Sequence, residues 1–239
     1  MTSSTVCKAV IFDLYETLIS EYVPTWKSKQ TTAQRLGVDE DVFRRKWVRI
    51  QRERFTGEIP DFVTALRHVC ERLEHAVEEG ILQQLWQERL QLKRRPFERV
   101  EKTVVEMLVG LDEFDVKVGV LSNAAREEVM AWPDSVLAGL VDEAIFSCDV
   151  GAMKPDPAIY HLICERLAVA PTEALFVGDG GSDELVGASA VGLQPLWATW
   201  FLEQWPAWKG SDEMRERSAR FPQLREPSAL LQVVASSVD

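Results

Sequence analysis

Asp13 is the first residue of this chain whose position suits chemistry. It directly follows residues 10–12, an apolar run of Val, Ile and Phe that is typical of a buried strand. A carboxylate at the carboxyl end of such a strand can attack an electrophile or bind a metal ion. An aspartate in this place can also cap the turn that follows, so the chemical interpretation needs support from other residues.

Polar residues follow two further apolar runs, and a lysine lies between them. One run ends at Ser122 and Asn123, and the other ends at a glycine-rich turn that contains Asp179. Lys154 lies between them in a Lys-Pro-Asp-Pro sequence. Because the carboxyl ends of parallel strands meet at one edge of a sheet, where ligands of open α/β folds bind, we expect these residues near Asp13.

The glycine-rich turn contains two aspartates, Asp179 and Asp183, four residues apart. This spacing allows one carboxylate to bind a hard cation directly and the other to bind it directly or through water. Carboxylates, water and substrate oxygens are the ligands that Mg²⁺ prefers. Asp183 could instead cap the helix that follows, but capping does not explain Asp179.

The remaining polar residues suit an anionic substrate. Lys154 supplies a positive charge, which a site with several carboxylates needs if an anion is to approach, although an isolated lysine before proline is usually solvated. Ser122 is expected to donate a hydrogen bond to a substrate oxygen, helped by main-chain N–H groups at the start of the next helix. Asn123 either orients this loop or contacts the substrate.

In their order and spacing these four segments resemble the haloacid dehalogenase-like (HAD) hydrolase superfamily. The resemblance covers roughly residues 7–20 and 96–195, and it rests on the set of four, since each segment alone is a weak signal. It implies hydrolysis through a covalent intermediate on the first aspartate, Asp13.

The resemblance also implies roles for individual residues. Asp13, the main-chain carbonyl of Tyr15 and Asp179 would bind Mg²⁺, with Asp183 assisting. Thr17, in the same run as the nucleophile, and Tyr15 join Ser122, Asn123 and Lys154 as candidate catalytic residues.

The order of predicted elements indicates an α/β fold with an insert. Residues 21–95 carry long, charged, helix-forming side chains and apolar positions at helical spacing, without a convincing strand. Strands are expected near residues 117–121, 144–147, 175–177 and 193–197, alternating with helices. We therefore predict a HAD-like Rossmannoid core, with a parallel sheet and helices on both faces, from residues 1–20 and 96–239, and a smaller all-α cap domain from residues 21–95.

One position departs from the phosphatases of this superfamily. They usually carry a second aspartate two residues after the nucleophile, which protonates the leaving group and then activates water, but here that residue is Tyr15. A tyrosine with a pKa of about 10 is a poor substitute in both tasks. Tyrosine at this position resembles the 2-haloacid dehalogenase branch, whose leaving halide needs no proton.

The fourth segment nevertheless favours the phosphatase. The dehalogenase branch typically has Ser or Asn in this segment and no metal, whereas Asp179 would repel a carboxylate substrate unless a cation is bound. An acyl, enol or aryl leaving group, or an acid from the cap or Glu16, would compensate for the missing aspartate. We therefore predict a Mg²⁺-dependent phosphatase of a small phosphorylated metabolite, and retain a C–halogen hydrolase and a catalytically weak binding protein as alternatives.

The composition argues against several partners. A net charge of −11, a pI near 4.9 and dispersed basic residues do not suit nucleic acid. No segment approaches the roughly 18 apolar residues of a membrane span, and the first residues lack a signal-peptide pattern. Cys7, Cys70, Cys148 and Cys164 lack metal-binding spacing and are expected to be free thiols. We expect a cytoplasmic protein with a small anionic substrate; the sequence does not indicate its oligomeric state.

Two clusters have more than one interpretation. The aromatic residues Trp197, Trp200, Trp205 and Trp208 could form a partner surface, but we favour core and loop packing. A basic run over residues 44–52 could meet an anionic substrate, but we favour a solvated helix face.

Overall fold

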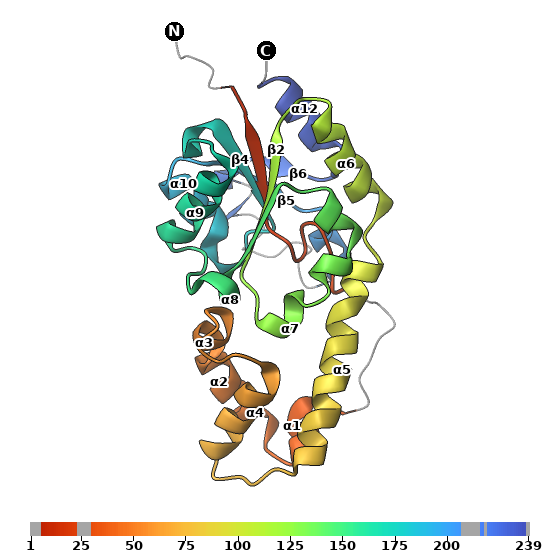
Figure 1. Cartoon of the computed structure of the whole chain (residues 1–239), viewed down its shortest axis with the longest axis vertical. Coiled ribbons are helices and arrows are strands. Elements are labelled where there is room, and N and C mark those ends of the chain that lie inside the picture. The colour runs from red at the N-terminus through yellow and green to blue at the C-terminus, as the bar shows by residue number, and fades with distance from the viewer. Residues whose placement is uncertain (1–5, 23–29, 207–215, 218, 238–239) are drawn as a thin grey trace.

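The computed structural model describes residues 6–22, 30–206, 216–217 and 219–237. One strand, at residues 9–12, precedes the described residues 30–112, whose regular elements are all helices, and strands and helices alternate after them. The molecule is elongated, with a sheet-containing core at one end and a group of helices at the other (Figure 1).

A parallel sheet of six strands forms the centre of the core in the described part of the chain. The strands are β1 (Ala9–Phe12), β2 (Lys117–Ser122), β3 (Glu143–Phe146), β4 (Ala174–Gly178), β5 (Gln194–Ala198) and β6 (Gln223–Leu224). Their order across the sheet is β3-β2-β1-β4-β5-β6, and every neighbouring pair is parallel. β1 lies between β2 and β4, so its carboxyl end is near the middle of the sheet edge.

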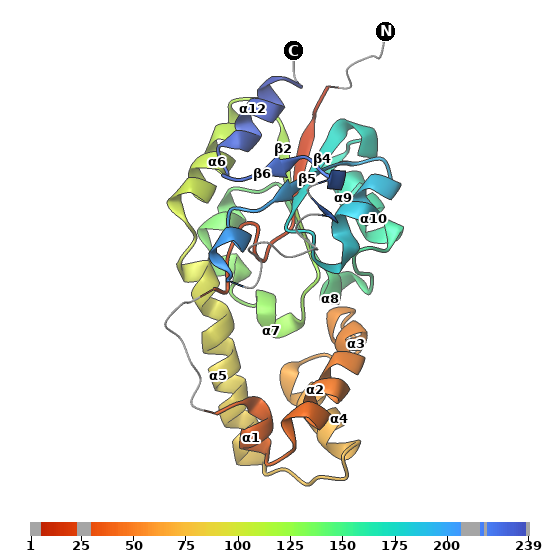
Figure 2. The same ribbon diagram turned by 180° about the vertical axis from the view of Figure 1, so that it is seen from behind.

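Helices cover both faces of the sheet (Figures 1 and 2). α6 (Lys102–Asp112) and α12 (Ala229–Ala235) pack on one face, and α9 (Pro157–Leu167) and α10 (Glu184–Ala190) pack on the other. The four residues of β1 alternate between the two hydrophobic clusters, as the two-residue period of a strand requires. β1 is therefore buried from both sides.

This arrangement confirms the predicted α/β class, with a parallel sheet and helices on both faces. β2 to β5 lie within one or two residues of the predicted strands. β6 was not predicted, because two residues, Gln223 and Leu224, are too few to show a strand pattern.

The helical group lies beyond the carboxyl edge of the sheet (Figure 1). It consists of α1 (Thr32–Leu36), α2 (Glu40–Arg49), α3 (Gln51–Phe55), α4 (Phe62–Glu71) and α5 (Glu79–Glu98). α1, α2, α4 and α5 share a hydrophobic cluster of their own. α5 continues through Pro96, past the expected end of the cap at residue 95. We retain the cap at residues 21–95 as a proposal, supported by this separate cluster.

Two short helices of the core meet the helical group. α7 (Arg126–Val129) packs against α5, and α8 (Ser147–Val150) packs against α3. Both follow strands at the carboxyl edge, so the helical group contacts the loops that carry the candidate site. Within the described residues, no helix combines the length and apolar character required to cross a membrane.

Candidate active site

Asp13 lies at the centre of the carboxyl edge. Its main-chain N–H donates to Val177 O at 2.8 Å, which continues the pairing of β1 with β4. The side chain is 10% exposed. Thr17, which is fully buried, points its hydroxyl toward Asp13 Oδ2 at 3.4 Å. The predicted nucleophile is thus held at the end of a buried strand with one carboxylate oxygen near a hydroxyl.

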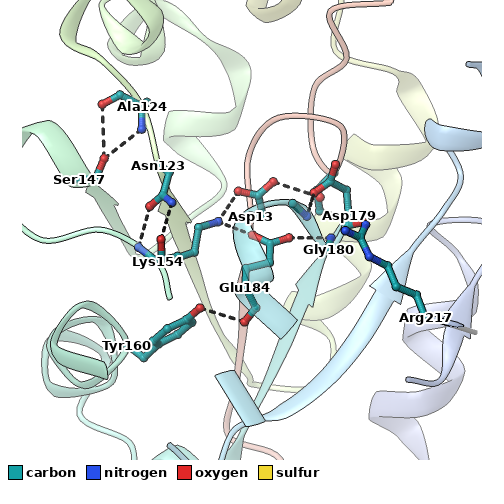
Figure 3. Close-up of polar contacts among 12 residues, drawn as sticks. Asp13, Asn123, Ala124, Ser147, Lys154, Tyr160, Asp179, Gly180, Glu184 and Arg217 are labelled. Atoms are coloured by element: carbon teal, nitrogen blue, oxygen red, sulfur yellow. Dashed lines mark hydrogen bonds and ion pairs between the residues drawn. The ribbon is translucent and has the colours of Figure 1, made fainter. Parts of the chain in front are cut away.

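Lys154 forms ion pairs with two acidic side chains. Its Nζ lies 2.5 Å from Asp13 Oδ1 and 2.5 Å from Glu184 Oε2 (Figure 3). Burial by itself would lower the pKa of Lys154, but the negative charges of the two carboxylates outweigh it and raise the pKa above its usual value. The lysine is therefore a buried, permanently charged group rather than a solvated surface residue.

The side chain of Asn123 holds the loop that carries Lys154 by bonding to the main chain of Lys154. The side-chain amide donates to Lys154 O at 2.8 Å, and Lys154 N donates to Asn123 Oδ1 at 2.7 Å (Figure 3). Of the two predicted roles for Asn123, the structure supports the orienting one.

Glu184 is a site residue that the sequence did not indicate. It is 2% exposed and accepts a hydrogen bond from the main-chain N–H of Gly180 at 2.9 Å, besides its ion pair with Lys154. Tyr160 donates to its main-chain oxygen at 2.9 Å. Burial and the charge of Asp13 raise the pKa of Glu184, although Lys154 opposes them.

Asp179 completes a group of three carboxylates. Oxygens of Asp13, Asp179 and Glu184 lie within 4.8 Å of one another, and Gly181 N donates to Asp179 Oδ1 at 2.8 Å. Burial and the charge of Asp13 raise the pKa of Asp179 to about 6. Three hard oxygen donors this close to each other suit Mg²⁺, whose charge would relieve their repulsion.

Asp183 does not join this group. Its side chain is exposed, and it makes no capping hydrogen bond although it precedes α10. The reason is the shape of the turn: Gly180, Ser182 and Asp183 have φ of 88°, 54° and 53°. In this left-handed backbone a spacing of four does not return the side chain to the same side, and the next residue, Glu184, faces the site instead.

Tyr15 is not placed to act as a proton donor. Its hydroxyl donates to the main-chain oxygen of Glu128 at 2.6 Å. Burial, together with the charge of Glu128, raises the pKa of Tyr15 well above its usual value. The Glu16 carboxylate accepts hydrogen bonds from Ser20, from the main chain of Glu21 and from Trp205. Tyr15 and Glu16 therefore shape the loop after the nucleophile.

Ser122 is 1% exposed at the end of β2. The expected help from the next helix is reduced, because Ala124 N donates to Ser147 Oγ and Ala125 N donates to Glu128 Oε2, each at 3.0 Å. These two N–H groups are engaged within the protein, and the contact of Ser122 with a substrate oxygen stays a prediction.

The tryptophans support the loops of the site. The indole N–H of Trp197 donates to Asp179 O at 2.8 Å, and that of Trp200 donates to Thr17 O at 2.9 Å. Trp205 donates to Glu16 Oε2 at 2.9 Å. Trp197 and Trp200 are buried in the core, whereas Trp205 is half-buried and packs on the loop after Asp13, which agrees with the predicted core and loop packing. Trp208 lies outside the described residues. The aromatic cluster can be recognised in the sequence, but its hydrogen bonds to the loops of the site cannot.

The model for the haloacid dehalogenase-like hydrolase family matches residues 7–192. This fold and this edge of the sheet therefore define a hydrolase, and the chain belongs to the haloacid dehalogenase-like family, as the four segments implied.

Known relatives include both reaction types. The chain is 26% identical over 208 residues to (S)-2-haloacid dehalogenase 4A of Burkholderia cepacia, covering 79% of this chain and 81% of that protein. It is 30% identical over 93 residues to glyceraldehyde 3-phosphate phosphatase of Methanopyrus kandleri, covering 38% of this chain and only 39% of the phosphatase. A solved HAD phosphatase from Thermococcus onnurineus has a TM-score of 0.63 at 21% identity, covering 97% of this chain and all of that one. Similarity thus supports the fold and the hydrolase class. The choice between a phosphatase and a dehalogenase has to be argued from the residues of the site.

Proposed function

We propose that this protein is a Mg²⁺-dependent phosphatase that acts on a small phosphorylated metabolite through an aspartyl-phosphate on Asp13. The observation that carries the proposal is the group of Asp13, Asp179 and Glu184, with oxygens within 4.8 Å of one another. Three carboxylates, the ammonium of Lys154 and the guanidinium of Arg217, which donates to Asp179 O at 3.1 Å, sum to a formal charge of −1, from −3 and +2. A divalent cation offsets that charge, so an anionic phosphate ester can then approach.

The residues present suit the metal. Asp13, Asp179 and Glu184 would hold it, and the main-chain carbonyl of Tyr15 is a further ligand that the family resemblance implies. The more exposed Asp183 would act only through water. When bound, Mg²⁺ supplies positive charge that stabilises the phosphoryl oxygens during transfer.

The proposed reaction has two steps on Asp13. In the first, an Asp13 oxygen forms a bond to phosphorus while the ester bond breaks, and the leaving oxygen keeps the electron pair. In the second, water attacks the phosphorus of the aspartyl-phosphate, and inorganic phosphate leaves as the carboxylate is regenerated. Lys154 balances the charge of Asp13 in both steps, and Ser122 would donate a hydrogen bond to a phosphoryl oxygen.

The leaving group determines which esters react. Tyr15 is protonated and engaged with Glu128, and Glu16 is held by three donors, so neither is placed as a proton donor. An acyl, enol or aryl leaving group is stable enough as an anion to leave without one. We infer that the substrate is an activated phosphate ester or anhydride. A cytoplasmic location is part of this proposal, supported by four buried free cysteines.

A C–halogen hydrolase is the second candidate. Tyr15 favours it, and so does the match to a dehalogenase over most of its length. Asp179 and Glu184 weigh against it, because two further carboxylates beside Asp13 would repel the carboxylate of a 2-halo acid. A binding protein without activity would have no use for three buried carboxylates in one place, since unpaired buried charges destabilise a fold.

The test is release of inorganic phosphate from an activated aryl phosphate, with Mg²⁺ and with a chelator. We expect release only with Mg²⁺, and none from the Asp13→Asn variant. Asp112→Asn, an exposed aspartate on α6, serves as the matched control and should retain full activity. Chloride release from 2-chloropropionate without metal, and no phosphate release, would replace the proposal with the dehalogenase.

A further inference from the structure

A cavity of about 540 Å³ lies between α5 and the core, and we call it the α5 cavity. Its walls come from residues 20–22 in the loop after β1, from residues between 89 and 101 in α5 and the turn that follows, and from residues 201–205 after β5. The residues around the candidate nucleophile are not part of these walls: Asp13, Ser122, Lys154, Asp179 and Glu184. Its volume is in the range of sites that hold small molecules, so it is a candidate for a second binding site.

One side of α5 supplies positive charge to this cavity. Arg89, Leu92, Arg95 and Arg99 follow one another at intervals of three or four residues, which places them on the same side of the helix. Arg89 is already paired with Glu128 at 2.7 Å. Arg95 is half-buried and Arg99 is exposed, and in the part of the chain that the structure describes neither side chain forms a hydrogen bond or an ion pair. Two guanidinium groups on the wall of one cavity are thus available to a ligand.

The acidic residues on the walls do not neutralise these two groups. Glu21 is paired with Lys93 at 2.5 Å, which leaves Glu101 to set against Arg95 and Arg99. These three unpaired side chains carry a formal charge of +1, from +2 and −1. In a chain of net charge −11, a cavity with a positive balance favours an anionic ligand. A guanidinium group suits phosphate in particular, because it can donate two parallel hydrogen bonds to its oxygens.

Aromatic side chains form another part of the wall. The rings of Tyr22 and Trp205 have their centroids 4.9 Å apart and are tilted by 50°, and Phe201 lines the cavity beside them. The indole N–H of Trp205, its single hydrogen-bond donor, is used by Glu16 Oε2 at 2.9 Å. The Trp205 ring therefore offers the cavity only apolar surface, on which a flat ring of a ligand can stack.

We propose that the α5 cavity is a second binding site, and that its ligand is a nucleoside monophosphate. The phosphate would bind Arg95 and Arg99, and the base would stack on the aromatic wall. Two guanidinium groups match the double charge of a phosphate monoester better than the single charge of a carboxylate. Glu101 opposes the higher charge of a triphosphate. A nucleoside without phosphate leaves both arginines unpaired, and a sugar phosphate leaves the rings of Tyr22 and Trp205 uncovered.

The site contacts both passages of the chain between the core and the helical group. Residues 20–22 follow β1 on the way to α1, and residues 95–101 lead from α5 into α6. The Glu16 carboxylate, which binds Trp205, also accepts a hydrogen bond from Ser20 at 2.8 Å. A ligand in this cavity would therefore fix both passages and the loop that follows the nucleophile. The inference does not depend on which bond the enzyme hydrolyses.

Calorimetric titration of the wild-type protein in a chelator tests the site. Without a cation, the carboxylates of Asp13, Asp179 and Glu184 repel an anion, so binding there does not interfere. AMP is compared with adenosine, which lacks the phosphate, and with ribose 5-phosphate, which lacks the base. We expect AMP to bind at least about tenfold more tightly than either, since only AMP uses both the arginines and the aromatic wall. Arg95→Met with Arg99→Met, and separately Tyr22→Leu, should each weaken AMP binding about tenfold or more.

Arg94→Met is the matched control. Arg94 is the neighbour of Arg95 on α5, but it does not line the cavity and is paired with Glu98 at 2.9 Å and with Asp134 at 3.3 Å. Its replacement should leave the affinity for AMP unaltered. Thermal unfolding shows whether each variant is folded. If the double arginine variant is not, Arg99→Met alone serves, because Arg99 is exposed at the end of α5.

Three results would overturn the second site. They are no binding of AMP, equal binding of the three compounds, and an affinity for AMP that survives the variants of Arg95, Arg99 and Tyr22. AMP that binds only with Mg²⁺ and is displaced by orthovanadate would belong to the group around Asp13, and would overturn it as well. None of these results uses phosphate release, so the proposed phosphatase function stands or falls separately.

Discussion

Glu184 Oε2 lies 2.5 Å from Lys154 Nζ, and both side chains are almost completely buried. Glu184 therefore has two roles. It holds Lys154 beside Asp13, and it contributes the third carboxylate of the candidate metal group. The stability and the chemistry of this edge of the sheet depend on the same pair, and mutations of it should affect both.

Replacing Lys154 by Met should strongly destabilise the protein. The change leaves Asp13 and Glu184 buried without their shared cation, and breaking a buried pair in this way costs about 3–5 kcal/mol. Urea unfolding without metal measures the loss. Phosphate release should fall at least 100-fold, because the charge beside Asp13 is lost.

A double variant distinguishes charge from packing. Lys154→Met with Glu184→Gln removes one of the unpaired carboxylates, so it should regain a substantial part of the lost stability while remaining inactive. If the double variant unfolds as easily as Lys154→Met alone, burial of charge is not the cause of the instability.

Asp179→Asn should raise the melting temperature of the metal-free protein at pH 7. Burial and Asp13 raise the pKa of Asp179 to about 6, so its ionised form is disfavoured in the folded state. The cost of ionisation is fully present above pH 6 and absent below the unfolded pKa of about 3.9. The advantage of the variant should therefore shrink as pH falls from 7 to 4, as calorimetric scans at several pH values can show.

With Mg²⁺ bound, the wild-type protein should have a higher melting temperature than Asp179→Asn. The wild-type protein should be stabilised by the metal at pH 7 because it binds only the folded state, and Asp179→Asn should respond much less. Equal stabilisation of both proteins by Mg²⁺ would remove Asp179 from the metal site.

Gly178→Ala should damage the site through Glu184. A Cβ on Gly178 would overlap Glu184 Oε1, and Phe176 also lies close, so the carboxylate must move. We expect a destabilisation of about 1–3 kcal/mol in urea unfolding and a weaker response to Mg²⁺. Gly80→Ala is the matched control: Gly80 lies in α5 with no atom near its Cβ position, and alanine should stabilise the helix by about 0.5–1 kcal/mol. If Gly178→Ala changed neither the free energy of unfolding nor the response to Mg²⁺, the Glu184 carboxylate would not be fixed against Gly178.

Phosphate release should depend steeply on the leaving group. Phenyl and cyclohexyl phosphate are similar in size, but only the phenol, with a pKa of about 10, leaves readily without a proton. Because Tyr15 does not act as an acid, we expect kcat/KM for the phenyl ester to be higher by about 10²–10⁴, the usual contribution of a general acid. Similar values for both esters would show that another group supplies the proton.

β1 to β5 were predictable because they are largely apolar runs of four to six residues, and the candidate residues at their ends follow from the topology of a parallel sheet. Asp13, Lys154 and Asp179 meet for that reason. Glu184 was not predictable, because the left-handed residues Ser182 and Asp183 decide which acid faces the site, and neither residue type announces such a conformation.

The contacts between segments far apart in the chain could not be predicted from the sequence either. The pairing of Trp200 with Thr17 and of Trp205 with Glu16 joins residues more than 180 positions apart. The basic run at residues 44–52 is plain in the sequence, whereas the sequence does not show that Arg54, two positions beyond it, is buried. Burial of a charged side chain depends on the packing of several helices and has no local signature.

The central claim is that Asp13 accepts the phosphoryl group. The most direct test mixes wild-type protein with an aryl phosphate and Mg²⁺, stops the reaction with acid during turnover, and measures the mass of the peptide that contains Asp13. We predict a phosphorylated Asp13, which disappears with a chelator and in Asp13→Asn. Phosphate release that continues in Asp13→Asn, or an ester formed on Asp13 from 2-chloropropionate instead, would contradict the account.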